Sequence, residues 1–248
     1  MLQRYLIAVL VALGAPTHHA LAGEWSGNVS GESRYFPQEA LDTRQGDFNA
    51  SLYTQPEFYH EWRGGDFALV FEPFFRLDSR DDERTHFDLR ELNVLALAGN
   101  WEWRVGLGKV FWGVTESQHL VDIINQTDLV ENIDGEDKLG QPMIHATWLP
   151  EWGAAEFFVL PGFRERTFPG AKGRVRTPLA VDTDSPSYES GHEERHIDWA
   201  IRLKTTYGPW DVGVSHFNGT SRVPELRPGL DGAGNPVLIP RYNLIDQT

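Results

Sequence analysis

The stretch IDWAIRLKTTYGPW, residues 197–210, decides the fold class. Apolar side chains occupy every second position from Ile197 to Leu203, and the intervening positions include Asp198, Arg202 and Lys204. A period of two is that of a β-strand with one apolar and one charged face. The joint at residues 208–209 is Gly-Pro, which ends the strand and allows a tight turn. The stretch therefore predicts a long strand that leads directly into a second one.

The same alternation recurs along the chain, and the joints between segments are in turn long and short. The short joints are residues 63–65, 99–100, 151–153 and 208–209, and the long ones are 36–48, 79–86, 113–141, 163–195 and 219–241. An antiparallel meander with tight turns at one end and free loops at the other has this rhythm. Bacterial outer-membrane barrels combine short periplasmic turns with longer outer loops in this way.

Ten segments alternate in this manner: 25–35, 49–62, 66–78, 87–98, 101–108, 142–150, 154–160, 197–207, 210–218 and 241–247. Most run for roughly nine to thirteen residues, near the length that a tilted membrane strand needs, whereas soluble strands more often have about five or six. Pro56 predicts a bulge or weak pairing in the second segment. The phase of the fourth changes around Glu91–Leu92, which predicts a β-bulge.

Aromatic residues near the segment ends favour a membrane location for these strands. The chain has nine Trp, and Trp or Tyr stands near the ends of most segments, at positions 25, 35, 62, 101, 148, 152, 207 and 210. Trp and Tyr are enriched at membrane–water interfaces. We therefore predict an all-β fold, an antiparallel up-and-down transmembrane β-barrel. The chain supplies about ten strands and stops at Asp246-Gln247-Thr248 inside a strand, so we expect a larger, truncated barrel of which it is the N-terminal portion.

The alternation also suits a soluble β-sandwich or a lipocalin-like barrel, in which the apolar face would point inward and the charged face outward. The first 22 residues favour export in either case. Arg4 precedes the apolar run 5–15, and Ala20-Leu21-Ala22 forms an A-x-A cleavage site. We predict that residues 1–22 are a signal peptide, that residues 23–248 are the barrel domain, and that the protein resides in the bacterial outer membrane.

Composition excludes several classes of function. The chain has no cysteine, which rules out thiol catalysis and cysteine-ligated metal centres, and its net charge of -14 argues against a nucleic-acid partner. Ser215 and His216 are neighbours on a strand and point to opposite faces, so they cannot act as a nucleophile and its base. We expect no enzyme activity and no cofactor.

With the strands placed, the chain resembles uncharacterised porin-like outer-membrane β-barrel proteins of Gram-negative bacteria. The resemblance rests on WRVGLGKVFWG at residues 103–113, LVDIIN at 120–125 and LIPRY at 238–242, and it is most specific around residues 101–145. It implies a fold and a location, but it identifies no substrate.

The long connection 113–141 would be the third outer loop, which general porins of this layout fold into the lumen as a constriction. It is rich in carboxylates, and charged rings in channels select ions. A solvated loop outside the barrel is the alternative. The candidates for pore lining or constriction are Glu102, Arg104, Glu116, His119, Asp122, Asp198, Arg202 and Lys204. Glu116, His119 and Asp122 would share one side of a helical turn, but their spacing matches no known metal motif, and we predict no metal site.

These observations predict an outer-membrane porin-like channel for passive diffusion of small polar solutes. Two alternatives remain open: a surface-exposed interaction or adhesion barrel that binds partners through its outer loops, and a soluble periplasmic β-protein. The expected partners are outer-membrane lipid, lipopolysaccharide and small polar solutes, with a homo-oligomer as one option. The loop 163–195 carries a basic block before an acidic one. The basic block could meet lipopolysaccharide phosphates, or the two blocks could pair with each other or with water.

Overall fold

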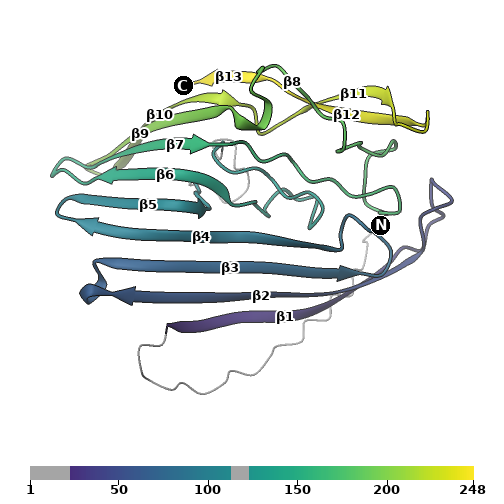
Figure 1. The fold of residues 1–248 in the computed structure, drawn as a ribbon, viewed down its shortest axis with the longest axis horizontal. Helices are drawn as coiled ribbons and strands as arrows, with labels where there is room; N and C mark the ends of the chain where they lie inside the picture. The colour runs from purple at the N-terminus through teal and green to yellow at the C-terminus, as the bar shows by residue number, and fades with distance from the viewer. Residues whose placement is uncertain (1–22, 113–122) are drawn as a thin grey trace.

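The computed structural model describes residues 23–112 and 123–248, and they form an all-β fold without α-helices. Ten strands build one antiparallel sheet (Figure 1). In sheet order they are β1 (Glu24–Tyr35), β2 (Phe48–Trp62), β3 (Phe67–Asp78), β4 (His86–Ala98), β5 (Trp101–Gly108), β6 (Gln141–Trp148), β7 (Ala154–Pro161), β9 (Ile197–Tyr207), β10 (Trp210–Thr220) and β13 (Leu244–Gln247). The predicted ten-strand antiparallel meander is therefore confirmed as a sheet.

The sheet is not closed. Its order begins at β1 and ends at β13, and these two strands do not pair with each other. The last strand pairs with only four residues of β10, from Phe217 to Thr220. The short turns lie together at one end of the strands and the long connections at the other (Figure 1), as the spacing of the joints predicted. A 3-10 turn, η1 (Arg63–Gly65), forms the joint between β2 and β3.

A second, three-stranded sheet, which was not predicted from the sequence, forms within the long connections. Its strands are β11 (Glu225–Leu230), β12 (Pro236–Tyr242) and β8 (Ser187–Tyr188), in that order, and a second 3-10 turn, η2 (Glu193–Arg195), follows β8. The predicted final strand 241–247 is in fact divided between β12 and β13. These strands were not predicted because they contain proline at positions 228, 236 and 240. Proline has no backbone N–H to donate to a neighbouring strand and usually signals a loop.

Both predicted irregularities are present. Pairing between β2 and β3 is interrupted between Thr54 and Phe58, on either side of Pro56. The register of β3 with β4 shifts at Glu72/Pro73, opposite Arg90, which is one residue before the predicted phase change. The extra residue in β4 is the expected result of a β-bulge.

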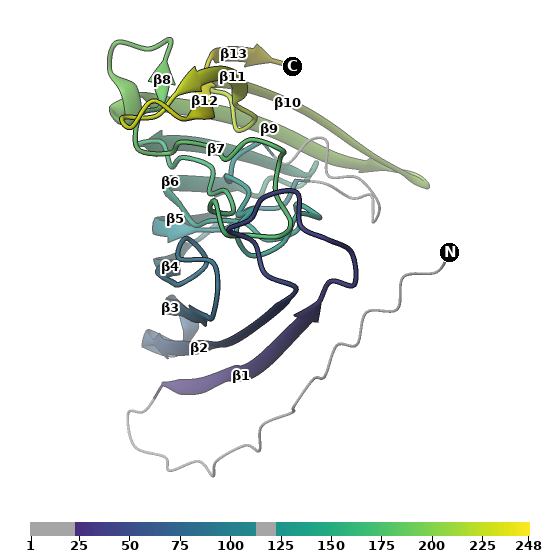
Figure 2. The same cartoon turned by 90° about the vertical axis from the view of Figure 1, so that its right-hand side faces the viewer.

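The sheet curves, and the long connections lie on its concave side (Figure 2). The opposite, convex face exposes large apolar side chains on nine strands of the sheet, β1 to β7, β9 and β10. Examples, with exposed fractions, are Val29 50%, Leu52 53%, Phe75 43%, Leu92 42%, Val105 50%, Ile144 43%, Val159 45%, Trp199 44% and Val214 60%. Large contiguous apolar patches are rare on the surfaces of soluble monomers.

Aromatic side chains mark both ends of the strands. At the short-turn end, Trp101 stacks on Trp148 with ring centroids 6.2 Å apart, and Trp148 meets Trp152 edge-on at 6.1 Å. At the other end, Tyr35 and Phe87 are 71% and 66% exposed. Most of the Trp and Tyr residues that sequence places near strand ends lie at the short-turn end.

The buried apolar cluster of the protein lies on the concave side, at β6, β7, β9 and β10. Its members are Trp112, Ile124, Met143, Phe158, Leu160, Ala200 and Phe217. Ile124 belongs to the long connection between β5 and β6, so this connection is held against the sheet. Within the described ranges, no helix is long and apolar enough to cross a membrane.

Candidate functional site

The segment 123–139, between β5 and β6, lies on the concave face of the sheet instead of projecting into solvent. Ile124, Asn125, Gln126 and Asp128 are each at most 2% exposed. The segment doubles back on itself, because the amide of Asp128 donates to the carbonyl of Asp137 and the amide of Leu139 donates to that of Gln126, both at 2.8 Å. This turn is the described part of the predicted third outer loop.

Asn125 ties the start of the segment to the end of β5. Its Nδ2 donates to the carbonyls of Gly108 at 2.8 Å and Leu139 at 2.9 Å, and its Oδ1 accepts from the amide of Val110 at 2.7 Å. Buried side-chain amides are stable only when their donors and acceptors are paired, and here three bonds meet that requirement. The contact fixes the segment next to its own strand.

Glu131 anchors the tip of the segment to β3. Its carboxylate accepts from Nε of Arg76 at 2.9 Å and from Nη2 at 2.5 Å. Both side chains are nearly inaccessible, with 4% of the Arg76 and 6% of the Glu131 side chain exposed. The guanidinium of Arg76 also lies over the ring of Tyr53, 4.2 Å from its centroid. A forked charge-assisted pair of this kind is both strong and specific in direction.

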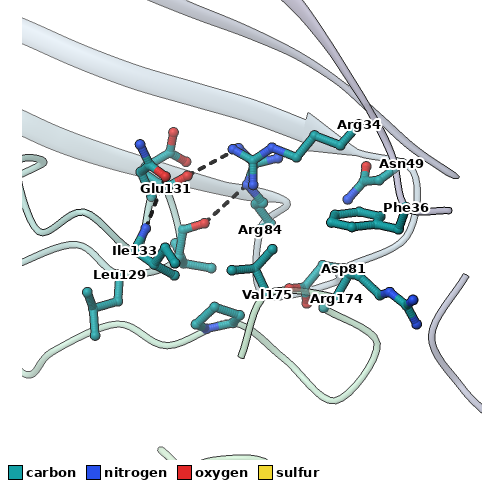
Figure 3. A pocket seen from close by; sticks show the side chains of 14 residues that line it. Arg34, Phe36, Asn49, Asp81, Arg84, Leu129, Glu131, Ile133, Arg174 and Val175 are labelled. Atoms are coloured by element: carbon teal, nitrogen blue, oxygen red, sulfur yellow. Dashed lines mark hydrogen bonds between the residues drawn. The ribbon is translucent and has the colours of Figure 1, made fainter. Parts of the chain in front are cut away.

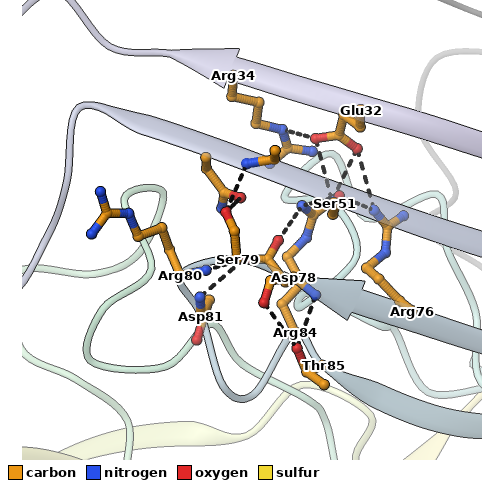
Figure 4. Close-up of polar contacts among 12 residues, drawn as sticks. Glu32, Arg34, Ser51, Arg76, Asp78, Ser79, Arg80, Asp81, Arg84 and Thr85 are labelled. Atoms are coloured by element: carbon orange, nitrogen blue, oxygen red, sulfur yellow. Dashed lines mark hydrogen bonds and ion pairs between the residues drawn. The ribbon is translucent and has the colours of Figure 1, made fainter.

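Arg84, in the connection between β3 and β4, extends this network to β1 (Figure 4). It pairs with Glu32 of β1 at 3.1 Å and with Asp78 of β3 at 3.1 Å. Its Nε also donates to the carbonyl of Val130 at 3.1 Å. One cation thus joins two strands of the sheet to the segment.

A second buried cation, Arg90, holds the segment to β4. Its Nη1 lies 2.6 Å from the carboxylate of Asp128 and 3.1 Å from that of Asp88. Arg164, from the connection after β7, pairs with Asp88 at 2.6 Å. Asp128 is fully buried, and the hydroxyl of Thr167, in the same connection as Arg164, donates a hydrogen bond to its carboxylate.

Asp198 of β9, one of the predicted lining residues, lies on the concave face and is 0% exposed. Its carboxylate pairs with Arg222 at 2.7 Å and with Nδ1 of His196 at 2.8 Å, and it accepts from the amide of Thr220 at 2.9 Å. Arg222 in turn donates from Nε to the carbonyl of Ile124 at 2.9 Å. Asp198 therefore helps to hold the segment 123–139.

The other predicted lining residues that the structure describes also lie on the concave face, and all are partly exposed. Arg104 donates to the carbonyl of Lys109 at 3.2 Å, and Arg202 donates to that of Trp112 at 3.0 Å. Lys204 pairs with Glu156 of β7. Glu102 is on the same face of β5. Glu116, His119 and Asp122 lie outside the described residues, as does the predicted signal peptide 1–22.

Three residues of the basic block in the connection 162–196 pair with acidic residues of other parts of the chain. Arg164 pairs with Asp88, Lys172 with Asp82 at 2.6 Å, and Arg176 with Asp42 at 2.8 Å. The sequence also allowed the basic block to pair with the acidic block of the same connection, but the acidic partners of these three residues lie elsewhere in the chain. These pairs bind the connection 162–196 to β4 and to the connections 79–85 and 36–47.

The space between these connections and the charged network is small (Figure 3). A cavity of about 20 Å³ lies among Arg34, Arg84, Glu131 and Arg174. This volume is enough for about one water molecule. The segment 123–139 is therefore packed closely against the sheet at this point. In the described part of the chain, no group of three or more His, Asp or Glu side chains could hold a metal ion.

Burial shifts the titration of several groups in the connections. It raises the pKa of Asp81, which is 2% exposed and accepts from the amide of Gly170 at 3.1 Å. Burial likewise raises the pKa of Tyr188, whose hydroxyl donates to Glu165. Desolvation disfavours the charged form in both cases.

Sequence reasoning missed the arginines that organise this site, among them Arg84, Arg90 and Arg222. The signal for Arg90 was present, because alternation in β4 before the bulge places Asp88 and Arg90 on one face. Arg84 and Arg222 lie in connections, where alternation carries no information. No protein-family model, curated protein or solved structure matches this chain.

Proposed function

We propose that this chain forms part of the wall of an outer-membrane β-barrel that works as a channel for small polar solutes, and that the segment 123–139 narrows the passage. The convex face, which exposes apolar side chains on β1 to β7, β9 and β10, is the observation that carries the proposal. In water, exposure of this face costs about 25 cal/mol for each Å² of apolar surface. Contact with lipid removes that cost.

The lengths of the strands agree with this assignment. β1 to β4 have 12, 15, 12 and 13 residues, and β9 and β10 have 11 each. A tilted membrane strand needs about 9–11 residues. The shorter β5, β6 and β7 have 8 residues each. β5 begins at Trp101, β6 ends at Trp148, and Trp152 lies in the turn before β7, and Trp side chains suit an interface.

The polar concave face supports the assignment of a water-filled side. Glu102, Arg104, Arg202 and Lys204 lie there, partly exposed. The segment 123–139 covers part of this face through two buried ion pairs, Arg76–Glu131 and Arg90–Asp128. Ions would therefore pass only through the part of the lumen that the segment 123–139 does not cover.

The charge of the passage depends on which acidic groups remain unpaired by arginine. Asp128 and Glu131 are neutralised by arginines of the sheet, while Asp134 and Asp137 are exposed on the same segment. Carboxylates at a constriction favour cations. We therefore expect a weak preference for K⁺ over Cl⁻, which the D134N/D137N double variant reduces.

The test is ion conductance in planar bilayers, measured on the closed barrel of which this sheet would form part of the wall. The main variant replaces residues 128–137 by Asn-Gly, which suits a tight hairpin turn because Thr127 and Lys138 already face each other as an antiparallel bridge. The deletion removes Asp128 and Glu131, so the variant also carries Arg90→Gln and Arg76→Gln, which prevents either arginine from being left buried without its carboxylate partner. We expect conductance from the wild type and a larger conductance from the shortened variant.

The proposal fails if neither protein conducts although both insert into the bilayer. An unchanged conductance after shortening would remove the segment's role as a constriction and leave the channel itself in place.

A further inference from the structure

A pocket of about 440 Å³ opens between the segment 123–139, the connection after β7 and the start of β11. It is separate from the contacts between the segment and the sheet. Its walls are mainly apolar and include Leu129, Ile133, Phe168, Val181, Val223 and Leu226. The volume is within the range of about 300–1,000 Å³ that is usual for small-molecule sites. We call this space the apolar pocket.

Its polar lining is cationic. The chain has 36 acidic residues against 22 Lys and Arg, yet, of the residues that the structure describes, Arg166 and Arg176 line the apolar pocket and no Asp or Glu does. An acid-free wall in so acidic a protein favours an anion by charge complementarity and disfavours a cation.

The two arginines differ in what they can still bind. Arg176 is engaged, because it pairs with Asp42 at 2.8 Å and donates to the carbonyls of Thr177 and Pro178 at 2.7 and 2.9 Å. Arg166 donates from Nε to the amide oxygen of Gln126 at 3.1 Å. Neither of its Nη groups has an acceptor among residues 23–112 and 123–248, and burial lowers its pKa.

Arg166 is also held in place from behind. Its backbone amide donates to the hydroxyl of Tyr242 at 3.0 Å, and Tyr242 is 1% exposed. The bond from Nε to Gln126 fixes the plane of the guanidinium, since Gln126 is 1% exposed. The two free Nη groups form the edge of the fork that binds a carboxylate through two parallel hydrogen bonds.

We propose that the apolar pocket binds a small organic carboxylate with an aromatic or otherwise apolar body, whose carboxylate pairs with Arg166 and whose body contacts Phe168, Val181 and Leu226. This inference does not depend on whether the sheet forms a channel. A binding measurement tests it separately from conductance.

The test is isothermal titration calorimetry of the full chain in lipid nanodiscs, with naphthalene-2-carboxylate as the probe and empty nanodiscs as the blank. Naphthalene-2-carboxamide has the same shape without the charge. We expect the Kd of the carboxylate to be at least about tenfold lower than the Kd of the amide.

Three variants locate the site. Arg166→Gln removes the charge and should weaken carboxylate binding at least about tenfold. Arg174→Gln removes a charge from the same connection, but Arg174 does not line the apolar pocket, so binding should stay within about twofold. Val223→Phe fills the pocket from a position that is 69% exposed, so it should fold normally and weaken binding of both probes.

Several results would overturn the inference. These are no binding by the wild type, equal affinity for the carboxylate and the amide, or unchanged carboxylate affinity in Arg166→Gln. If Arg166→Gln folds poorly, Val223→Phe decides the matter: full carboxylate affinity in that variant would show that the probe binds elsewhere.

Discussion

Glu131→Gln is the perturbation that most directly tests how the segment 123–139 is held on the sheet. In the wild type, the Glu131 carboxylate accepts hydrogen bonds from Nε and Nη2 of Arg76, whose side chain is 4% exposed. Removal of one partner from a buried ion pair typically costs about 3–5 kcal/mol, because the other charge stays buried without compensation. Glu32 still lies 3.4 Å from Nη1 of Arg76 and offsets part of this loss. We therefore expect a loss near the low end, about 3 kcal/mol.

The assay is urea unfolding of the refolded protein, followed by the fluorescence of its nine Trp residues. Glu136→Gln is the matched control, because Glu136 is exposed on the same segment and such changes usually stay within about 0.5 kcal/mol. Adding Arg76→Gln to Glu131→Gln should cost less than the sum of the single changes, since groups in contact are not additive. A loss below about 1 kcal/mol for Glu131→Gln, or full additivity with Arg76→Gln, would refute the reasoning.

Three further predictions test the convex face, a buried carboxyl and a strained glycine. Val29→Arg places a charge at the middle of β1 on the convex face and should cost about 2–4 kcal/mol of folding free energy in a bilayer. The control Asn28→Arg, on the opposite face, should cost under about 1 kcal/mol. Both losses are measured by urea titration in lipid vesicles, and equal losses would contradict the orientation of the sheet. Because burial raises the pKa of Asp81, the folded state binds the Asp81 proton more tightly than the unfolded state does. The contribution of Asp81 to the free energy of unfolding therefore falls as the pH rises from the pKa of the unfolded state, near 4, through the pKa of the folded state. The stability of Asp81→Asn relative to wild type should then increase from pH 4 to pH 7, and parallel pH profiles would exclude this effect. Gly106 has φ +131°, and a Cβ there would lie 2.2 Å from the carbonyl oxygen of Leu92, so Gly106→Ala should cost at least about 1–3 kcal/mol; thermal unfolding that matches the wild type would show that β5 can relax.

Alternation and joint length were sufficient to predict the sheet. A period of two fixes which face each side chain of a strand occupies, as Asp198, Trp199 and Arg202 illustrate, and the joints fix the order of the strands. The bulge near Glu91 could also be predicted, because one extra residue reverses the alternation. These are local properties, and sequence records them directly.

The contacts of the connections could not be predicted, because they join residues far apart in the chain. Arg76 and Glu131 are 55 positions apart, and Arg222 and Ile124 are 98 apart. Nothing in the sequence distinguishes the buried Asp198 from the partly exposed Glu102, because both are acidic residues on the polar face of a strand. The small sheet formed by β8, β11 and β12 was missed for a related reason, since its strands are short and contain proline.

The most direct test of the account is a comparison of lipid and water access along single strands. The chain has no cysteine, so one nitroxide spin label can be attached at a single introduced cysteine, and its collisions with oxygen and with a water-soluble nickel chelate can be measured in vesicles. Labels at Val105 and Val214, on the convex face, should be relaxed mainly by oxygen, and labels at Glu102 and Ser215, on the concave face, mainly by the nickel chelate. The reverse pattern, or equal access at all four positions, would contradict the claim that the apolar face of this sheet meets lipid.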